Sequence, residues 1–215
     1  MAGHPMVINL EIRDERMLQI VPNLELERIA SGFVFTEGPV WDVASGSLIF
    51  SDIIGNCLYR WSSRQGLSIF RRPSNMANGN ALDRSGRLLT CEHATSRVTR
   101  THHDGRIEVL ASHYAGRELN SPNDIVVKSD GAIYFTDPTS GRSARYGVER
   151  PQQLPFQGVY RIDPDSGDVT LLVDDFEKPN GLCFSRDEQK LFINDTARGH
   201  IRVFDVRSDG TLEGG

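Results

Sequence analysis

Oxygen-bearing side chains recur at one position of an internal repeat in this 215-residue chain. Each lies 14 or 15 residues before an acidic residue that ends an apolar segment. The four residues are Glu37, Asn78, Asn123 and Asn180. A carboxylate and several amides, brought together, form a hard oxygen donor set, which suits Ca²⁺ or Mg²⁺ better than Zn²⁺. The pattern therefore predicts a divalent-cation site wherever the fold gathers the repeats.

The same residue types also have a plain structural interpretation, because Asn tolerates left-handed backbone and hydrogen-bonds locally in turns. That interpretation is favoured for Asn78. Glu37 is different, since Glu is a poor turn residue and here it precedes Gly38 and Pro39. A functional role is favoured for Glu37, whereas Asn123 and Asn180 fit either interpretation equally.

The acidic residues close four copies of one strand pattern: SLIFSD at Asp52, RLLTCE at Glu92, AIYFTD at Asp137 and KLFIND at Asp195. The intervals are 40, 45 and 58 residues. The next strand begins six residues after the acid in three copies but 22 after it in the third, which indicates an insertion of sixteen within residues 138–158. Without it, the last interval is 42, and a period of about 40 to 45 is typical of four-stranded propeller blades.

This repeat predicts an all-β fold, a β-propeller of which about four blades are present. The first strand of each blade lines the central axis, so residues that enter these strands face one another. We expect residues 1–215 to form one propeller domain that is incomplete at its C-terminus, because the chain stops at Gly215, where the outermost strand of blade four should begin. The segment 24–35 is expected to add a strand before blade one.

The insertion of blade three is rich in Arg, Gln, Gly and Pro. Alternating strand direction places it on the same face of the propeller as Glu37 and Asn123. It is either a lid over the site or a loop packed on a neighbouring blade. His93, which follows the second strand of blade two, is interpreted as a rim residue.

The amino-acid composition excludes some classes of binding partner. The net charge of −5 and the pI near 5.7 provide no basic field for nucleic acid or anionic membranes. No apolar run reaches membrane-spanning length, and charged residues between positions 11 and 16 interrupt any signal-peptide core, so a cytoplasmic location is the default expectation. Three cysteines without a CxxC spacing argue against a disulfide framework or a zinc site.

Four motifs, FTEGPVWD, LNSPNDIVVKSDGAIYFTDP, GVYRID and KPNGLCFS, occur in this order between residues 24 and 212. Together they closely resemble the gluconolactonase and regucalcin-like (senescence marker protein) family of six-bladed β-propellers. The resemblance implies a hydrolase of lactones, which are cyclic carboxylic esters, with one divalent cation in the central channel. The expected ion is Ca²⁺, with Zn²⁺ or Mg²⁺ as alternatives.

The resemblance also assigns roles to residues. The family's metal-binding glutamate falls on Glu37 and its metal-binding asparagine on Asn180. The asparagine that reaches substrate, and in some relatives the metal, falls on Asn123. Two departures are clear: the family's remaining metal aspartate, thought to accept the proton, belongs to a later blade, and an arginine that contacts sugar in animal members falls on Ser121.

These assignments predict metal-dependent hydrolysis of a small sugar lactone, with water attacking a polarised carbonyl. Asp124 is expected to help bind substrate, and by sequence it is also the nearest candidate for a general base. As a strand neighbour of Asn123, however, it is expected to point away. The GxSxG motif of serine hydrolases is absent. The alternative is a non-catalytic Ca²⁺-binding or protein-binding propeller, and the oligomeric state is left open.

Overall fold

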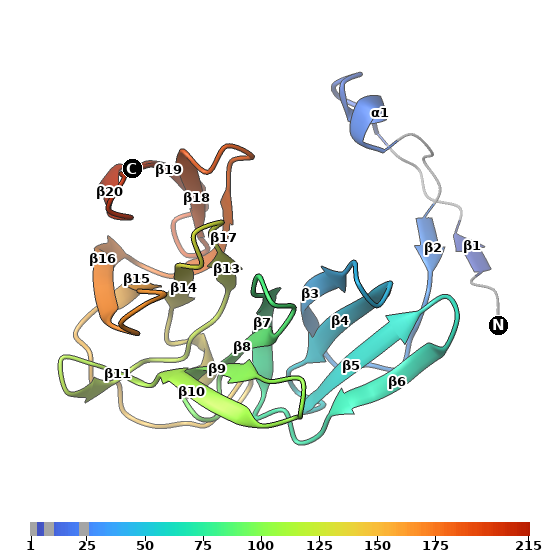
Figure 1. The fold of residues 1–215 in the computed structure, drawn as a ribbon, viewed down its shortest axis with the longest axis horizontal. Helices are drawn as coiled ribbons and strands as arrows, with labels where there is room; N and C mark the ends of the chain where they lie inside the picture. The colour runs from blue at the N-terminus through green and yellow to red at the C-terminus, as the bar shows by residue number, and fades with distance from the viewer. Residues whose placement is uncertain (1–3, 7–10, 22–25) are drawn as a thin grey trace. The chain divides into compact units, whose positions relative to one another are not determined.

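The computed structural model describes residues 4–6, 11–21 and 26–215, and these form two compact units, Met1–Phe33 and Val34–Gly215. In the first unit, β1 (His4–Met6) pairs with β2 (Leu26–Arg28), and α1 (Met17–Ile20) lies between them in the chain (Figure 1). The strand expected within residues 24–35 is thus present as β2, but it pairs inside the first unit. Residues 1–3, 7–10 and 22–25 of the expected single domain lie outside the described residues.

The second unit confirms the propeller-like arrangement, with four antiparallel sheets of four strands that follow one another along the described chain. Blade one holds β3 (Thr36–Asp42), β4 (Ser47–Asp52), β5 (Cys57–Ser62) and β6 (Gly66–Arg71). Blade two holds β7 (Ala77–Leu82), β8 (Leu88–Glu92), β9 (Arg97–Thr101) and β10 (Ile107–Ala111). A hairpin of β11 (His113–Tyr114) and β12 (Arg117–Glu118) follows.

Blade three holds β13 (Ile125–Val127), β14 (Ile133–Asp137), β15 (Gln157–Ile162) and β16 (Val169–Phe176), with the short 3₁₀-helix η1 (Ser140–Arg142) inside its insertion. Blade four holds β17 (Pro179–Phe184), β18 (Lys190–Asp195), β19 (His200–Val206) and β20 (Leu212–Gly214). The prediction that blade four lacks its outermost strand was wrong. Three residues, Leu212–Gly214, pair with β19 and supply it.

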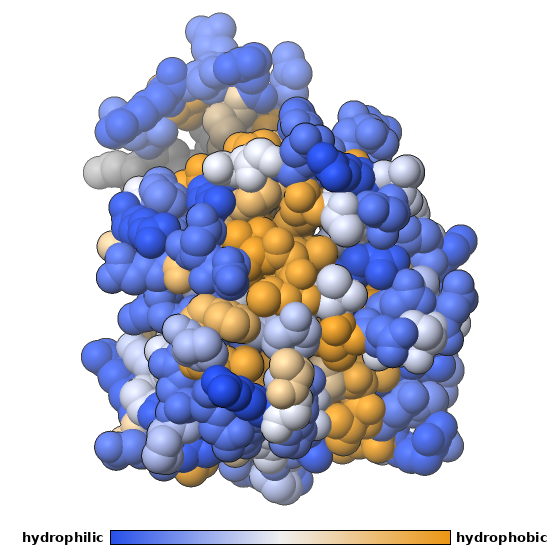
Figure 2. Space-filling view, turned by 90° about the vertical axis from the view of Figure 1, so that its left-hand side faces the viewer, coloured by the Kyte–Doolittle hydropathy of each residue, from blue (hydrophilic) through white to orange (hydrophobic). Residues whose placement is uncertain are grey.

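Alternation along the second strands explains why the blades stack. In β14, Ile133 and Phe135 pack with residues of blade two, whereas Tyr134 on the opposite side packs with residues of blade four, among them Leu182 and Phe204. A strand with both faces buried needs apolar residues at successive positions, as IYF provides. Each such buried side chain contributes about 1.5–3 kcal/mol relative to exposure. Figure 2 shows that apolar side chains also reach the surface on the side that carries β16 and β20 in Figure 1.

The repeated aspartates have a structural role that the sequence pattern alone did not identify. Asp52, Asp137 and Asp195 each accept hydrogen bonds from two successive backbone N–H groups at distances of 2.7–3.1 Å. These N–H groups belong to the segments that lead into β3, β13 and β17, the innermost strands. Each carboxylate therefore fixes the chain where it turns towards the axis.

Glu92 holds the equivalent place in blade two but acts through side chains. Its fully buried carboxylate pairs with Arg71 at 3.1 Å and Arg97 at 2.7 Å, and it also accepts from Asn75 and Thr95. The longer side chain thus replaces the two backbone bonds with an ionic network. No helix in the described part of the chain is long and apolar enough to cross a membrane.

Candidate active site at the axial rim

The four inner strands β3, β7, β13 and β17 lie side by side around the axis (Figure 1). A cavity of about 480 Å³ runs beside them, lined from all four blades by residues that include Val40, Asn80, Asp124 and Leu182. At one end of these strands lie the predicted residues Glu37, Asn78, Asn123 and Asn180. The four repeat positions thus lie where the inner segments of the four blades begin.

Their backbones are joined from blade to blade. The Ser51 hydroxyl donates to the Asn78 carbonyl at 2.6 Å, the Gly79 N–H donates to the Asn123 carbonyl at 2.7 Å, and the Thr136 hydroxyl donates to the Asn180 carbonyl at 2.7 Å. These bonds fix the main chain of successive rim residues at the junctions between blades. Side chains on so firm a frame are well placed for a preorganised site.

Glycine after the rim residue allows this close approach. A Cβ on Gly38 would lie 2.1 Å from the Asn78 carbonyl oxygen, and one on Gly79 would lie 2.5 Å from the Asn123 carbonyl oxygen. Real Cβ atoms do not approach backbone oxygen so closely, so any other residue would push the inner strands apart. Glu37-Gly38, Asn78-Gly79 and Asn180-Gly181 share this pattern, whereas Asn123 is followed by Asp124.

Three of the four inner strands are irregular at the rim residue. The register shifts between Glu37 and Val40 in β3, between Ala77 and Asn80 in β7, and between Pro179 and Leu182 in β17. Such bulges twist a strand locally and redirect its side chains, and they are common beside active sites. Regular strand alternation therefore does not predict where these side chains point.

The predicted ligands keep free side-chain atoms. Within the described residues, the amides of Asn123 and Asn180 have no hydrogen-bond partner, and Asn123 is only 5% exposed. The half-buried carboxylate of Glu37 accepts one long bond, at 3.3 Å, from the N–H of Gly38. Buried polar groups normally have partners. The buried amide of Asn123, together with the partly buried Glu37 and Asn180, therefore leaves acceptor oxygens available to a ligand.

Asp124 was expected to point away from the axis, but in the structure it lines the axial cavity. The Asn123 N–H donates to the Thr136 carbonyl, and the Thr136 N–H donates to the Asp124 carbonyl. Asn123 and Asp124 therefore both lie opposite Thr136, and their side chains do not alternate between the two faces of the strand as in a regular strand. The Asp124 carboxylate accepts from the Ile125 N–H at 2.9 Å and, across to the next blade, from the Leu182 N–H at 3.2 Å.

Burial raises the pKa of the Asp124 carboxyl above its ordinary value. The two backbone N–H bonds oppose this shift, and the charge of Glu37 adds to it. Two carboxylates close enough to interact in a buried place resist being ionised together. A cation between them would relieve that cost.

Two features of the rim were not recognised in the sequence. Asn78, favoured as a turn residue, donates from Nδ2 to His93 Nε2 at 3.1 Å, and His93, expected at the rim, is only 1% exposed. The insertion covers this ring: the Tyr146 carbonyl accepts from His93 Nδ1 at 2.8 Å, and Gly141 lies against the ring. In the sequence, only the position of His93 directly after the repeat acid Glu92 hinted at this contact.

The insertion is thus packed on neighbouring blades, one of the two alternatives that the sequence left open. Arg142 is 7% exposed; it donates to the Asn120 carbonyl at 2.8 Å and pairs with Glu118. Arg150 donates to carbonyls of the turn after β8, and the Tyr146 ring lies 5.4 Å from that of Phe35. These contacts hold the segment along the rim from blade one to blade three.

The donors at the rim fit a hard divalent cation. One carboxylate and two free carboxamides match the oxygen ligands of Ca²⁺ and Mg²⁺, and they do not match the nitrogen and sulfur ligands usual for Zn²⁺. Among the described residues, no group of three or more His, Cys, Asp or Glu side chains could hold a metal. The set formed by Glu37, Asn123 and Asn180 contains one acidic residue and is therefore not a group of that kind.

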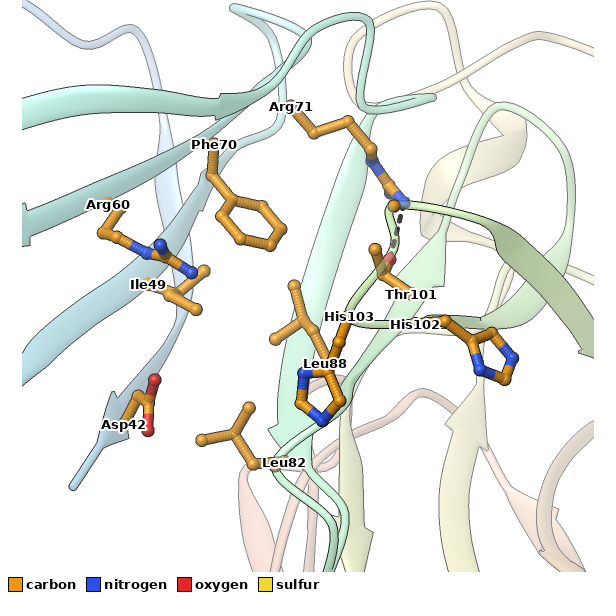
Figure 3. Close-up of a pocket in the computed structure, with 12 residues that line it drawn as sticks. Asp42, Ile49, Arg60, Phe70, Arg71, Leu82, Leu88, Thr101, His102 and His103 are labelled. Carbon is orange, nitrogen blue, oxygen red and sulfur yellow. Dashed lines mark hydrogen bonds between the residues drawn. The ribbon is translucent and has the colours of Figure 1, made fainter. Parts of the chain in front are cut away.

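A second cavity, of about 350 Å³, lies between blades one and two (Figure 3). The Arg60 guanidinium lies over the Phe70 ring at 4.7 Å, Arg71 donates to Thr101 at 3.3 Å, and His103 donates to a backbone carbonyl at 2.9 Å. None of the predicted residues lines it. The Nε atoms of Arg60 and Arg71 are buried there without a hydrogen-bond partner in the described structure. The one carboxylate among its described lining residues, Asp42, accepts from Ser45, so the cavity offers no comparable set of free oxygen donors.

Comparison with known proteins agrees with this architecture. A family model described as the SMP-30/Gluconolactonase/LRE-like region matches residues 35–214. The gluconolactonase of Zymomonas mobilis is 32% identical over 201 residues, which cover 86% of this chain and 56% of that protein. The lactonase drp35 of Staphylococcus haemolyticus is 25% identical over 209 residues, which cover 93% of this chain and 59% of that protein.

Among solved structures, a gluconolactonase from Xanthomonas campestris superposes with a TM-score of 0.91 at 33% identity, covering 99% of this chain and 73% of that one. A calcium-binding protein, regucalcin from Agrobacterium tumefaciens, superposes with a TM-score of 0.67 at 20% identity over 86% of this chain and 59% of that one, a likeness of fold alone. The chain thus spans between about half and three quarters of the length of these relatives. Since the family model covers most of its residues, the chain belongs to the SMP-30/gluconolactonase/LRE-like family.

Proposed function

We propose that this chain carries the axial site of a metal-dependent sugar lactonase. The observation that carries the proposal is a set of oxygen donors with unused acceptor capacity at the start of the inner segments of blades one, three and four, namely Glu37, Asn123 and Asn180. The backbones of Asn123 and Asn180 are also bonded to a neighbouring blade. Relatives named gluconolactonase and lactonase support the reaction class. Gluconolactone, a cyclic ester with several hydroxyl groups, is the proposed substrate.

Glu37 would supply the negative charge that holds the cation, and Asn123 and Asn180 would supply neutral oxygen donors. A bound divalent cation polarises an ester carbonyl and lowers the pKa of water. Asn123, next to Asp124 on the same bulge, would also orient the lactone. The insertion packed along the rim would limit the access of water to the site.

Asp124 is the proposed proton acceptor within this chain. Its carboxylate lines the axial cavity, and its raised pKa makes it a better base than an exposed aspartate. Each oxygen accepts one backbone N–H, which leaves lone pairs for a proton from the attacking water. Ring opening then requires that this proton reach the leaving alkoxide oxygen, so that water adds across the ester bond.

The test is pH-stat titration of glucono-1,5-lactone, with the uncatalysed rate subtracted, in the presence and absence of Ca²⁺ or Zn²⁺. We expect metal-dependent turnover that falls at least about a hundredfold in Glu37→Gln, the loss typical of removing one key electrostatic group. Glu108→Gln, a change of a partly exposed carboxylate in blade two that pairs with Arg100, is the matched control and should retain activity. Equal turnover by the two variants would refute the assignment of Glu37.

A second candidate is a cation that only joins the blades. The backbone bonds between successive rim residues favour it, because a cation shared by Glu37 and Asn180 would link blades one and four. In that case Ca²⁺ would raise the thermal stability of a chain that hydrolyses no lactone. A chain that hydrolyses the lactone only with metal would exclude this alternative.

A further inference from the structure

Asn78 is the one rim residue whose carboxamide is oriented by another side chain. Its Nδ2 lies 3.1 Å from His93 Nε2, and His93 Nδ1 lies 2.8 Å from the carbonyl oxygen of Tyr146. Asn78 is 4% exposed and His93 1% exposed, so water competes little for these bonds. The three groups form a chain that leads from the insertion to the inner strand of blade two.

Chemistry decides the direction of each bond. A carbonyl oxygen can only accept, so His93 Nδ1 carries the proton that is given to Tyr146. Burial lowers the pKa of His93, and the imidazole is therefore neutral, with an unprotonated Nε2. Nε2 must then accept from the Asn78 amide nitrogen, and this fixes which end of the carboxamide is nitrogen.

The carboxamide oxygen of Asn78 takes no part in this chain of hydrogen bonds. Oδ1 has no hydrogen-bond partner among residues 4–6, 11–21 and 26–215, although the side chain is almost fully buried. Asn78 sits between Glu37 and Asn123 in the ring: the Gly38 backbone approaches its carbonyl, and Gly79 is bonded to Asn123. An acceptor of fixed orientation thus lies between two proposed metal ligands.

We propose that Asn78 Oδ1 accepts a hydrogen bond from a hydroxyl group of the lactone, and that His93 is the positioning residue that holds it there. The inference rests on the proposed function. The carbonyl and ring oxygens of a lactone only accept hydrogen bonds, so among the groups of the lactone only its hydroxyl groups can donate to Oδ1. Asn78 would therefore favour polyhydroxylated lactones over plain ones.

The test compares kcat and KM for glucono-1,5-lactone and δ-valerolactone, which has the same ring without hydroxyl groups. We expect Asn78→Ala and His93→Phe to lower kcat/KM for gluconolactone about five- to tenfold, the effect of one neutral hydrogen bond, mainly through KM. δ-Valerolactone should change less than twofold and serves as the internal control. His93→Gln, which can again accept from Asn78, should recover part of the loss.

Equal losses on both lactones would overturn the proposal, because they would mean that the pair only supports the fold. The ¹⁵N shifts of the His93 ring give an independent check: Nδ1 should be protonated in the wild type, and the opposite tautomer would also overturn it.

Hydrolysis of neither lactone by the wild type would defeat the proposed function but would not decide this inference. In that case NMR titration with 1,5-anhydroglucitol, a cyclic polyol that cannot be hydrolysed, decides it. Binding that is weakened about five- to tenfold by Asn78→Ala upholds the acceptor role, and binding that is absent or unchanged rejects it.

Discussion

Every blade carries two oxygen-bearing side chains about 15 residues apart, and the two sets have opposite fates. The acids that end the second strands, such as Asp137 and Glu92, are buried and accept several hydrogen bonds each. The residues that begin the first strands, such as Glu37 and Asn123, keep oxygen atoms without partners in the described structure. The first set holds the propeller together, and we propose that the second set binds a ligand. Hydrogen-bond saturation therefore differs between the two sets within one repeat.

The largest effect on folding is expected for Glu92→Gln. The carboxylate is fully buried and pairs with Arg71, whose side chain is 12% exposed, and with Arg97. Removing one partner of a buried ion pair leaves uncompensated charge, at a cost of about 3–5 kcal/mol in the free energy of unfolding. Urea denaturation measures this loss. Glu108→Gln, on the surface, should cost less than about 1 kcal/mol, and equal losses would contradict the comparison.

Asp137→Ala should cost about 3 kcal/mol, because the buried N–H groups of Asn120 and Ser121 each lose an acceptor at 2.7 Å. Thermal unfolding with a matched substitution at Asp205, an exposed partner of Lys190, provides the reference. If Asp137→Ala were as stable as Asp205→Ala, the saturated acids would not hold the inner segments in place.

Two asparagines of one motif sharpen the comparison. Asn120 is fully buried, and its amide nitrogen donates to the carbonyls of Asp137 at 3.0 Å and Phe156 at 2.9 Å, while its Oδ1 has no partner in the described structure. Asn120→Ala should therefore cost about 2 kcal/mol of stability. Asn123→Ala should change the stability by less than about 0.5 kcal/mol but should abolish lactone hydrolysis. Unfolding and activity should be measured on both variants. A large loss of stability in Asn123→Ala, or a loss of activity without a loss of stability in Asn120→Ala, would contradict the account.

A smaller effect concerns pH. Burial lowers the pKa of His93, while its bond to Tyr146 opposes the shift. In the unfolded chain a histidine titrates near about 6.5, so the stability that the neutral ring contributes is complete above that pH and falls as the pH decreases below it.

Wild type and His93→Phe should be compared by urea unfolding between pH 7 and 5. The wild type should lose more stability over this range than the variant. Burial raises the pKa of Asp137 to about 7, so this residue makes the protein more stable as the pH falls. Because wild type and variant share this contribution, it cancels in the difference between their free energies of unfolding. Parallel curves would show that His93 is not held neutral.

Much of the fold was predictable because propeller blades repeat. The strand pattern ending in Asp52, Glu92, Asp137 and Asp195 gave the number and order of the blades, and the counting-back rule gave the rim residues. The insertion was located by the same arithmetic. Repetition could not tell that β20 (Leu212–Gly214) completes blade four, since three residues carry too little pattern.

The site was less accessible to sequence reasoning, for physical reasons. Strand alternation placed Asp124 away from the axis, but the bulge opposite Thr136 brings it to the axial cavity. The pairing of Asn78 with His93 depends on how the insertion folds back onto blade two, which local pattern does not encode. The metal and substrate assignments of Glu37, Asn123 and Asn180 remain predictions.

The most direct test of the central claim is isothermal titration of Ca²⁺ into this chain and its Glu37→Gln and Glu108→Gln variants. The account predicts a single site with one ion per chain, lost in Glu37→Gln and unchanged in Glu108→Gln. Calcium binding that survives Glu37→Gln unaltered would contradict it, because the free oxygen donors at the axial rim would then not be the cation ligands.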